Sequence, residues 1–338
     1  MTTTISSFTA LPDDVLQRVL LGVALDDQDA TAAACRAFTD VIRGPRFLRL
    51  RREYGFAERR VMIVCQRFPD TVEIHVAGKR RAVERVSEGL HLSTFYTSTT
   101  DGGARLFVST TRIHGPPYEI FAVDASARQW SPFATLPLSQ RLHCTEWHGG
   151  LLYVAGGIID GTYVDTFHAF NETTGLWEDL PRMPHVSTLA ASGVIGNQLF
   201  IAGGIDGANQ DLSALQIYDI TARTWRLGAP LPRALYGAWG VVVGDGKLYV
   251  VSSRLSEVQC MLMYDVQSNT WTEQSLPPQE SGGLMHAFAH KGSIVAVYSS
   301  GSVYQGETGS DQNNWSRIHL DVAPGAVYGA LAGSVLLG

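Results

Sequence analysis

The chain has little cysteine and no long hydrophobic run. Four of its 338 residues are cysteines, and no two of them stand in a CxxC spacing. Each lies in an apolar stretch, which predicts buried free thiols in a reducing compartment. No apolar run reaches the 18 residues of a membrane-spanning helix, and no signal-peptide pattern opens the chain. We therefore expect a cytoplasmic or nuclear location.

An excess of basic charge is also missing. The chain has 26 Lys and Arg residues against 32 Asp and Glu, a net charge of −6 at pH 7. This balance does not favour nucleic acid or an anionic membrane as a partner. The length of 338 residues exceeds that of one ordinary compact domain, unless the chain is built from repeats.

A repeat is indeed present, and tryptophan marks it. Five tryptophans recur at intervals of 44 to 48 residues: Trp130, Trp177, Trp225, Trp271 and Trp315. Three of them share one local pattern, in which a strand ending in an aromatic is followed by a turn, the tryptophan and a Leu-Pro (FNETTGLWEDLP, YDITARTWRLGAPLP, YDVQSNTWTEQSLP). Self-similarity at this period is typical of a repeat fold.

A second pattern accompanies the tryptophans. Hydrophobic strands that end in two small residues recur as GLLYVAGG (150–157), NQLFIAGG (197–204), GKLYVVSS (246–253) and GSIVAVYSS (292–300). An apolar strand precedes each one, and a third strand lies between it and the tryptophan strand. Four strands in a repeat of about 46 residues predict one blade of a β-propeller.

These landmarks, in this order, resemble the kelch repeat. The resemblance implies a mainly β fold, a kelch-repeat β-propeller over residues 60–338 with about six blades. It also implies that the tryptophan and the preceding aromatic pack between blades, and that the glycine pair lets strands approach closely. We expect the C-terminal segment VYGALAGSVLLG to complete the blade that begins near Val61, because this closure leaves no open sheet edge.

The first sixty residues have helical spacing instead. Apolar residues at Val15, Leu16, Val19 and Leu20 predict one amphipathic helix, and a second is expected to run through Ala30 to Val41. A third follows Pro45. The sequence pieces LPDDVLQRVL, CRAF (35–38) and PRFLRLRREYGF (45–56), in this order, resemble an F-box, which implies a small three-helix unit over residues 8–56.

The two resemblances suggest two binding surfaces. The first would dock a Skp-type adaptor by a helix-in-groove contact, and its candidate residues are Leu11, Pro12, Val15, Leu16 and Val19. The second would be a substrate face built from loops, and its candidates, near the starts of the inner strands, are Arg141, His143, His185, Arg233 and Tyr236. The Asp-Gly turns at 159–165 and 205–211 need no explanation beyond tight turning.

A run of arginines separates the two regions. It comprises Arg43, Arg46, Arg49, Arg51, Arg52, Arg59 and Arg60. The run could contact an acidic partner, but a solvated surface is the favoured interpretation.

An enzymatic function is a weaker hypothesis than a binding function. Some kelch propellers are copper oxidases, but His286 and His290 are four residues apart on an expected strand, and His143 and His148 would face opposite sides of theirs. The Gly-Gly segments lack the following helix of a dinucleotide site. We expect no catalytic residues, no metal and no cofactor.

The sequence thus predicts a substrate-recognition subunit of an SCF-type ubiquitin ligase, with the F-box binding a Skp-type adaptor, and through it a cullin, and the propeller binding a target protein. Two alternatives remain open: a kelch scaffold outside any ligase, favoured by the alanine-rich second helix, and a propeller that binds a small molecule.

Overall fold

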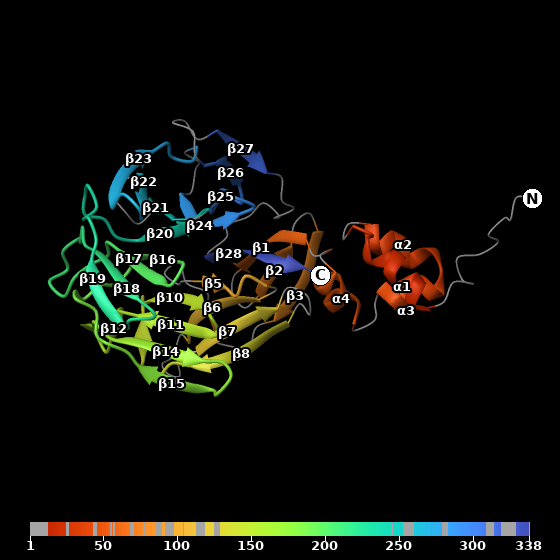
Figure 1. Ribbon diagram of the computed structural model, residues 1–338, viewed down its shortest axis with the longest axis horizontal. Helices are drawn as coiled ribbons and strands as arrows, with labels where there is room; N and C mark the ends of the chain where they lie inside the picture. The colour runs from red at the N-terminus through yellow and green to blue at the C-terminus, as the bar shows by residue number, and fades with distance from the viewer. Residues whose placement is uncertain are drawn as a thin grey trace, which may run out of the picture. The chain divides into compact units, whose positions relative to one another are not determined.

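The computed structural model divides into two compact units, residues 1–60 with 336–338 and residues 61–335. The described residues are 13–24, 27–42, 46–54, 56, 58–67, 71–76, 79–85, 90–91, 98–103, 105–112, 119–124, 129–244, 246–252, 260–278, 283–308, 314–318 and 329–337 (Figure 1).

The N-terminal unit is helical. Its elements are α1 (Asp13–Leu21), α2 (Gln28–Ala34), α3 (Arg36–Ile42) and α4 (Phe47–Glu53). The predicted second helix is therefore interrupted: Cys35 adopts an extended conformation, with φ −160° and ψ 163°, and separates α2 from α3. Six buried apolar residues form the core, namely Leu16, Leu20, Leu21, Ala32, Ile42 and Phe47. None of the described helices has the length and apolar character needed to cross a membrane.

The second unit is mainly β, and its described residues form six antiparallel sheets of four or more strands and one small sheet. Five have four strands each: β28-β1-β2-β3, β10-β11-β14-β15, β16-β17-β18-β19, β20-β21-β22-β23 and β24-β25-β26-β27. The sixth has the order β4-β6-β7-β8, with β5 also paired to β6, and a small sheet β13-β12-β9 stands apart. The C-terminal strand β28 thus lies beside β1.

The strand bounds follow the repeat found in the sequence. The first two sheets contain β1 (Glu58–Arg67), β2 (Thr71–Val76), β3 (Lys79–Arg85), β28 (Gly329–Leu337), β4 (Leu90–His91), β5 (Ser98–Thr100), β6 (Arg105–Arg112), β7 (Glu119–Asp124) and β8 (Gln129–Thr135). The next two, with the small sheet, contain β9 (Gln140–Arg141), β10 (Cys144–His148), β11 (Leu151–Ala155), β12 (Ile158–Ile159), β13 (Thr162–Tyr163), β14 (Phe167–Asn171), β15 (Leu176–Asp179), β16 (Ala191–Ile195), β17 (Gln198–Ala202), β18 (Leu215–Asp219) and β19 (Thr224–Leu227). The last two contain β20 (Ala238–Val242), β21 (Lys247–Ser252), β22 (Met261–Asp265), β23 (Thr270–Gln274), β24 (Leu284–His290), β25 (Ser293–Tyr298), β26 (Val303–Glu307) and β27 (Trp315–Ile318).

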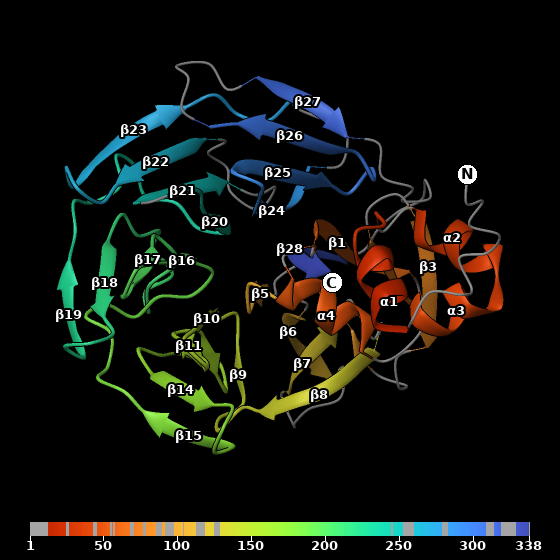
Figure 2. The ribbon, with the colours of Figure 1, turned by 45° about the vertical axis from the view of Figure 1, so that its right-hand side comes forward.

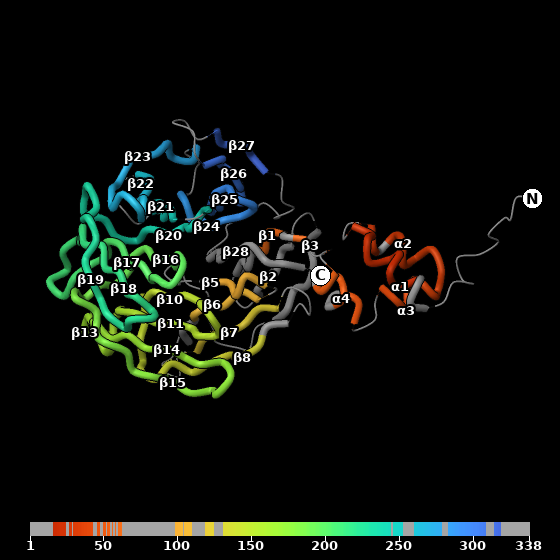
Figure 3. The backbone as a smooth tube through the Cα atoms, viewed as in Figure 1, coloured from red at the N-terminus to blue at the C-terminus, as the bar shows by residue number. Residues whose placement is uncertain are grey.

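The sheets of this unit are arranged like the blades of a propeller. They follow one another around a ring in chain order, with β10, β16, β20 and β24 toward its centre and β15, β19, β23 and β27 outside (Figure 2). The tube in Figure 3 follows this path through residues 129–244. Adjacent innermost strands contact one another, β5 with β10, β10 with β16, β16 with β20, and β20 with β24. This agrees with the predicted kelch blades.

Apolar side chains fill the space between neighbouring sheets. Phe167 of the third sheet in chain order meets Trp225 of the fourth, with ring centroids 5.1 Å apart. In three sheets the tryptophan lies opposite the aromatic residue of the pattern: Phe170 opposes Trp177, Tyr218 opposes Trp225 and Tyr264 opposes Trp271. The tryptophans at 177, 225 and 271 are therefore packing residues.

The glycine pairs permit a close main-chain approach. Gly156 and Gly157 have φ of 66° and 103°, and a Cβ on Gly157 would lie 2.5 Å from the carbonyl oxygen of Arg141. Where Ser252 replaces the first glycine of the pair, its buried hydroxyl accepts a hydrogen bond from the Cys260 N–H at 2.8 Å. A serine can thus take this place because its side chain has a partner.

Three of the four cysteines are described, and all three are free thiols. Cys144 and Cys260 are buried and Cys35 is half-buried. The prediction of buried thiols therefore holds for two of them, and the Cys65 side chain lies outside the described residues.

Candidate functional site

Loops from successive sheets meet at one end of the strands. Loops 136–143, 180–190 and 228–237 lead into the innermost strands β10, β16 and β20, and loops 156–166 and 203–214 follow the second strands of two sheets. Because the sheets are antiparallel and share one chain order, all five loops lie at the same end. We call their exposed side the strand-end surface.

Main-chain hydrogen bonds connect these loops from sheet to sheet. The Leu189 N–H donates to the Leu142 carbonyl at 3.1 Å, and the Gly237 N–H donates to the Leu189 carbonyl at 2.8 Å. Leu142, Leu189, Gly237 and Gly283 occupy the corresponding place in four repeats, and all have positive φ, from 55° to 69°. A leucine adopts this conformation only under constraint, so the loop entry is fixed by the fold.

The structure does not gather the five predicted substrate-face residues into one site. Arg141 and His185 are exposed, and Tyr236 is half-buried. Arg233 pairs with Glu273 at 2.8 Å, and both side chains are well exposed. These four remain candidates on the strand-end surface.

His143 is in the interior instead. It is 3% exposed, and its Nε2 lies 3.0 Å from the Oγ of Ser109, which is also buried. Burial lowers the pKa of His143 to about 4, so the imidazole is neutral at neutral pH. The expectation that His143 faces a ligand is therefore wrong: Leu142 turns the chain just before it, and the side chain enters the packed interior. The serine–histidine pair is sealed from any substrate.

The loops carry contacts that sequence reasoning missed. The Tyr163 hydroxyl donates to Asn209 Oδ1 at 3.1 Å, which joins loop 156–166 to loop 203–214. Asp165 pairs with Arg182 at 2.5 Å. The expected tight turns are present, since Asp206 Oδ1 accepts from the Ala208 and Gln210 N–H groups at 2.8 and 2.9 Å. The strand-end surface is therefore ordered by its own polar contacts.

The predicted adaptor face is described only in part. Leu11 and Pro12 lie outside the described residues, as does the Val15 side chain. Leu16 is 3% exposed and belongs to the helical core, whereas Val19 is 51% exposed. Tyr54 and Phe56 are also exposed apolar residues of this unit. Of the predicted residues that are described, only Val19 is available to a partner.

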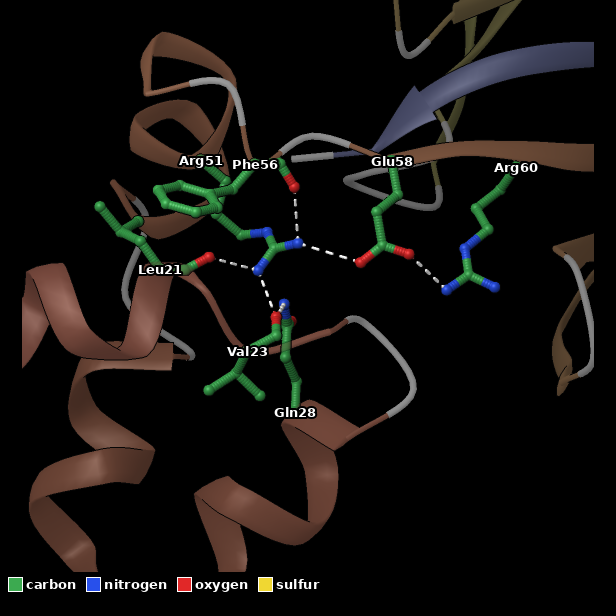
Figure 4. A network of polar contacts seen from close by, with 7 residues as sticks. All are labelled: Leu21, Val23, Gln28, Arg51, Phe56, Glu58 and Arg60. Atoms are coloured by element: carbon green, nitrogen blue, oxygen red, sulfur yellow. Dashed lines mark hydrogen bonds and ion pairs between the residues drawn. The ribbon is translucent and has the colours of Figure 1, made fainter. Parts of the chain in front are cut away.

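The arginine run contains a structural residue. Arg51 is 1% exposed and donates hydrogen bonds to the carbonyls of Leu21 at 2.6 Å, Val23, and Phe56 at 2.7 Å (Figure 4). Its guanidinium also contacts Glu58 at 3.1 Å, and Glu58 in turn pairs with Arg60 at 2.6 Å. Burial lowers the pKa of Arg51 while Glu58 opposes this shift.

The prediction of a solvated arginine surface is therefore wrong for Arg51. Its guanidinium satisfies carbonyls at the end of α1, which have no partner within the helix. Arg46 is exposed as predicted. Arg43 and the side chains of Arg49, Arg52 and Arg59 lie outside the described residues.

The described part of the chain contains no candidate metal site. No group of three or more His, Cys, Asp or Glu side chains converges there. His286 is buried beside Trp239, with ring centroids 4.3 Å apart, and burial lowers its pKa to about 3.

Comparison with known proteins finds kelch motifs in part of this chain. The kelch motif matches residues 142–184 and 188–232, the same segments as the third and fourth sheets. Human kelch-like protein 34 is 22% identical over 223 residues, which cover 59% of this chain and 34% of that protein. Kelch-like protein terF of Aspergillus terreus is 24% identical over 192 residues (51% and 41%). Kelch domain-containing protein 10 of Xenopus laevis is 28% identical over 165 residues (44% and 38%).

The chain thus spans well under half the length of these relatives. No F-box was detected. The repeat pattern and the six sheets agree with the kelch motif matched at residues 142–184 and 188–232, and the chain is distantly similar to the kelch-like proteins over part of its length.

Proposed function

We propose that this chain is a protein-binding adaptor that holds a target on the strand-end surface of its sheets. The observation that carries the proposal is the assembly of ordered loops from successive repeats at one end of the strands, with Arg141, His185 and Tyr236 accessible there. Loops positioned by a rigid scaffold are frequent sites of recognition. Fold alone does not name the target.

We further propose that the N-terminal helices bind a second protein, which would make the chain the substrate-recognition subunit of an SCF-type ubiquitin ligase. The F-box-like sequence pattern supports a Skp-type adaptor as this partner, and the exposed Val19 offers it an apolar contact. The chain would then raise the effective concentration of target lysines near a ubiquitin-conjugating enzyme. It would contribute binding surfaces and no chemistry.

Co-purification with a Skp-type adaptor tests the ligase role. The parent chain is expected to retain the adaptor, and the double variant Leu11→Ala with Pro12→Ala is expected to lose it. Retention in the double variant, or no adaptor with the parent, would contradict the proposal.

A kelch scaffold outside any ligase is the second candidate. The alanine-rich segment ATAAA (30–34) supports it, because F-boxes usually carry bulkier leucines there, and so does the absence of a detected F-box. In this case a target would bind the strand-end surface while no Skp-type adaptor binds the helices.

A further inference from the structure

Glu146 lies at a place where the other repeats have no ionisable group. It is the third residue of the innermost strand β10 and pairs with Tyr153. At the same register position, β16 has Gly193, β20 has Val241 and β24 has Ala287. An acid has therefore replaced a small or apolar residue at the contact between sheets.

Its carboxyl group joins three neighbouring sheets. Oε1 accepts a hydrogen bond from Ser192 Oγ of β16 at 2.7 Å, and Oε2 accepts one from Thr99 Oγ1 of β5 at 3.4 Å. The Thr99 hydroxyl also accepts from the Trp147 N–H at 3.3 Å. The three strands β5, β10 and β16 lie next to one another toward the centre of the ring (Figure 2).

No positive charge balances this carboxyl among the described residues. Strand β16 offers the Ser192 hydroxyl between Ala191 and Gly193, and β5 offers hydroxyls from Ser98 to Thr100. The titratable groups nearby are Cys144 on β10 and Tyr153 on β11, and burial raises the pKa of each to about 12, which leaves both neutral at neutral pH. Arg105 lies over the ring of the adjacent Trp147, but its guanidinium is paired with Asp101 and Glu172.

Glu146 is half-buried, and the loss of solvation without a counter-ion disfavours the ionised carboxylate. This loss raises the pKa of Glu146 to about 7, although the hydroxyls of Ser192 and Thr99 oppose the shift. A neutral carboxyl still accepts from Ser192, and its own O–H can donate to the Thr99 oxygen, so both bonds persist without a buried charge.

We propose that Glu146 is a proton-sensitive clasp between the sheets, which contributes more to their stability when its carboxyl is neutral than when it is ionised. The clasp operates around neutral pH, within the range that cells reach. It acts on the packing of the β5, β10 and β16 strands, behind the strand-end surface.

The pH dependence of unfolding tests the clasp. Because the native state holds the proton more tightly than the unfolded chain, the contribution of Glu146 to stability is full below about pH 4.5 and declines up to about pH 7. Urea unfolding of the parent and of Glu146→Gln should be followed from pH 5 to pH 8. The unfolding constant of the parent, relative to Glu146→Gln, is expected to rise by about tenfold or more across this range.

A control variant and a second measurement complete the experiment. Glu178→Gln removes an exposed carboxylate, so its pH curve should run parallel to that of the parent. Parallel curves for Glu146→Gln and the parent would overturn the proposal. If Glu146→Gln does not fold, carbon NMR of glutamate carboxyls in the parent decides: a signal titrating near pH 7 supports the clasp, and titration of every glutamate below pH 5.5 excludes it.

Discussion

The indole N–H of Trp225 donates a hydrogen bond to the main-chain carbonyl of Pro181 at 2.7 Å, and so ties one sheet to the segment that leaves the previous one. The same bond recurs from Trp177 to Thr135 at 2.8 Å, from Trp271 to Ala229 at 2.8 Å and from Trp315 to Ser275 at 3.4 Å. The regular spacing of tryptophan in the sequence is therefore the spacing of one repeated contact between sheets.

Truncation of Trp225 should destabilise the β unit without altering recognition directly. Trp225→Ala is expected to lower the free energy of unfolding by about 3–5 kcal/mol, because it removes packing against Phe167 and Tyr218 as well as the hydrogen bond. Trp225→Phe keeps much of the packing and should cost clearly less. Urea denaturation measures both, and equal costs would contradict the packing role.

The close approach at the glycine pair predicts a steric effect. A Cβ on Gly204 would lie 2.3 Å from Ser187 Oγ and 2.7 Å from the Thr188 carbonyl oxygen. Gly204→Ala should therefore destabilise the fold by more than about 3 kcal/mol. Gly196→Ala is the matched control, because Gly196 also has positive φ but no atom near the added Cβ. The control should cost about 1 kcal/mol, and similar losses for the two variants would contradict the account.

Removal of the Arg51 guanidinium should loosen the helical unit. Arg51→Met leaves the carbonyls of Leu21, Val23 and Phe56 without this donor, at an expected cost of about 3–5 kcal/mol. Arg46→Met changes an exposed arginine and should stay within about 0.5 kcal/mol. Limited proteolysis within residues 13–54, together with helical circular dichroism, separates the two variants. Equal protection of both would refute the role of Arg51.

Two buried histidines predict that the fold loses stability in acid. The pKa of His143 falls to about 4 and that of His286 to about 3, both because burial disfavours the charged ring. The stability they contribute is full above about pH 6.5, the unfolded value, and is lost as the pH falls toward 4. His286→Gln should flatten this part of the stability curve, whereas the exposed His185→Gln should not. This slope is opposite to that expected from Glu146, so each variant must be compared with the parent at every pH.

Features that repeat along the chain could be predicted from the sequence, whereas contacts made by a single long side chain could not. The tryptophan spacing and the small-residue pairs predict the sheets because each repeat makes the same local contacts. The break at Cys35 has no such signal, since alanine-rich sequence favours helix on either side of it. Arg51 reads as one charge in a basic run, because no sequence pattern says that its side chain reaches back to Leu21 and Val23.

The direction of single side chains was also not predictable at the proposed substrate face. The sequence locates the loops but not the direction of each side chain, and the turn at Leu142, with φ 57°, directs His143 inward. Glu146 does carry a signal in the sequence, because it is an acid within the apolar strand CTEWH, whereas the equivalent strands have no acidic residue.

Binding of the purified chain to a purified Skp-type adaptor, measured by calorimetry, tests the central claim most directly. The parent should bind, and Val19→Asp should weaken binding at least about tenfold, because it places a charge on the exposed apolar position of α1. Leu176→Asp, at a leucine of β15 that is 68% exposed, should bind like the parent. No binding by the folded parent, or equal binding by Val19→Asp, would contradict the account.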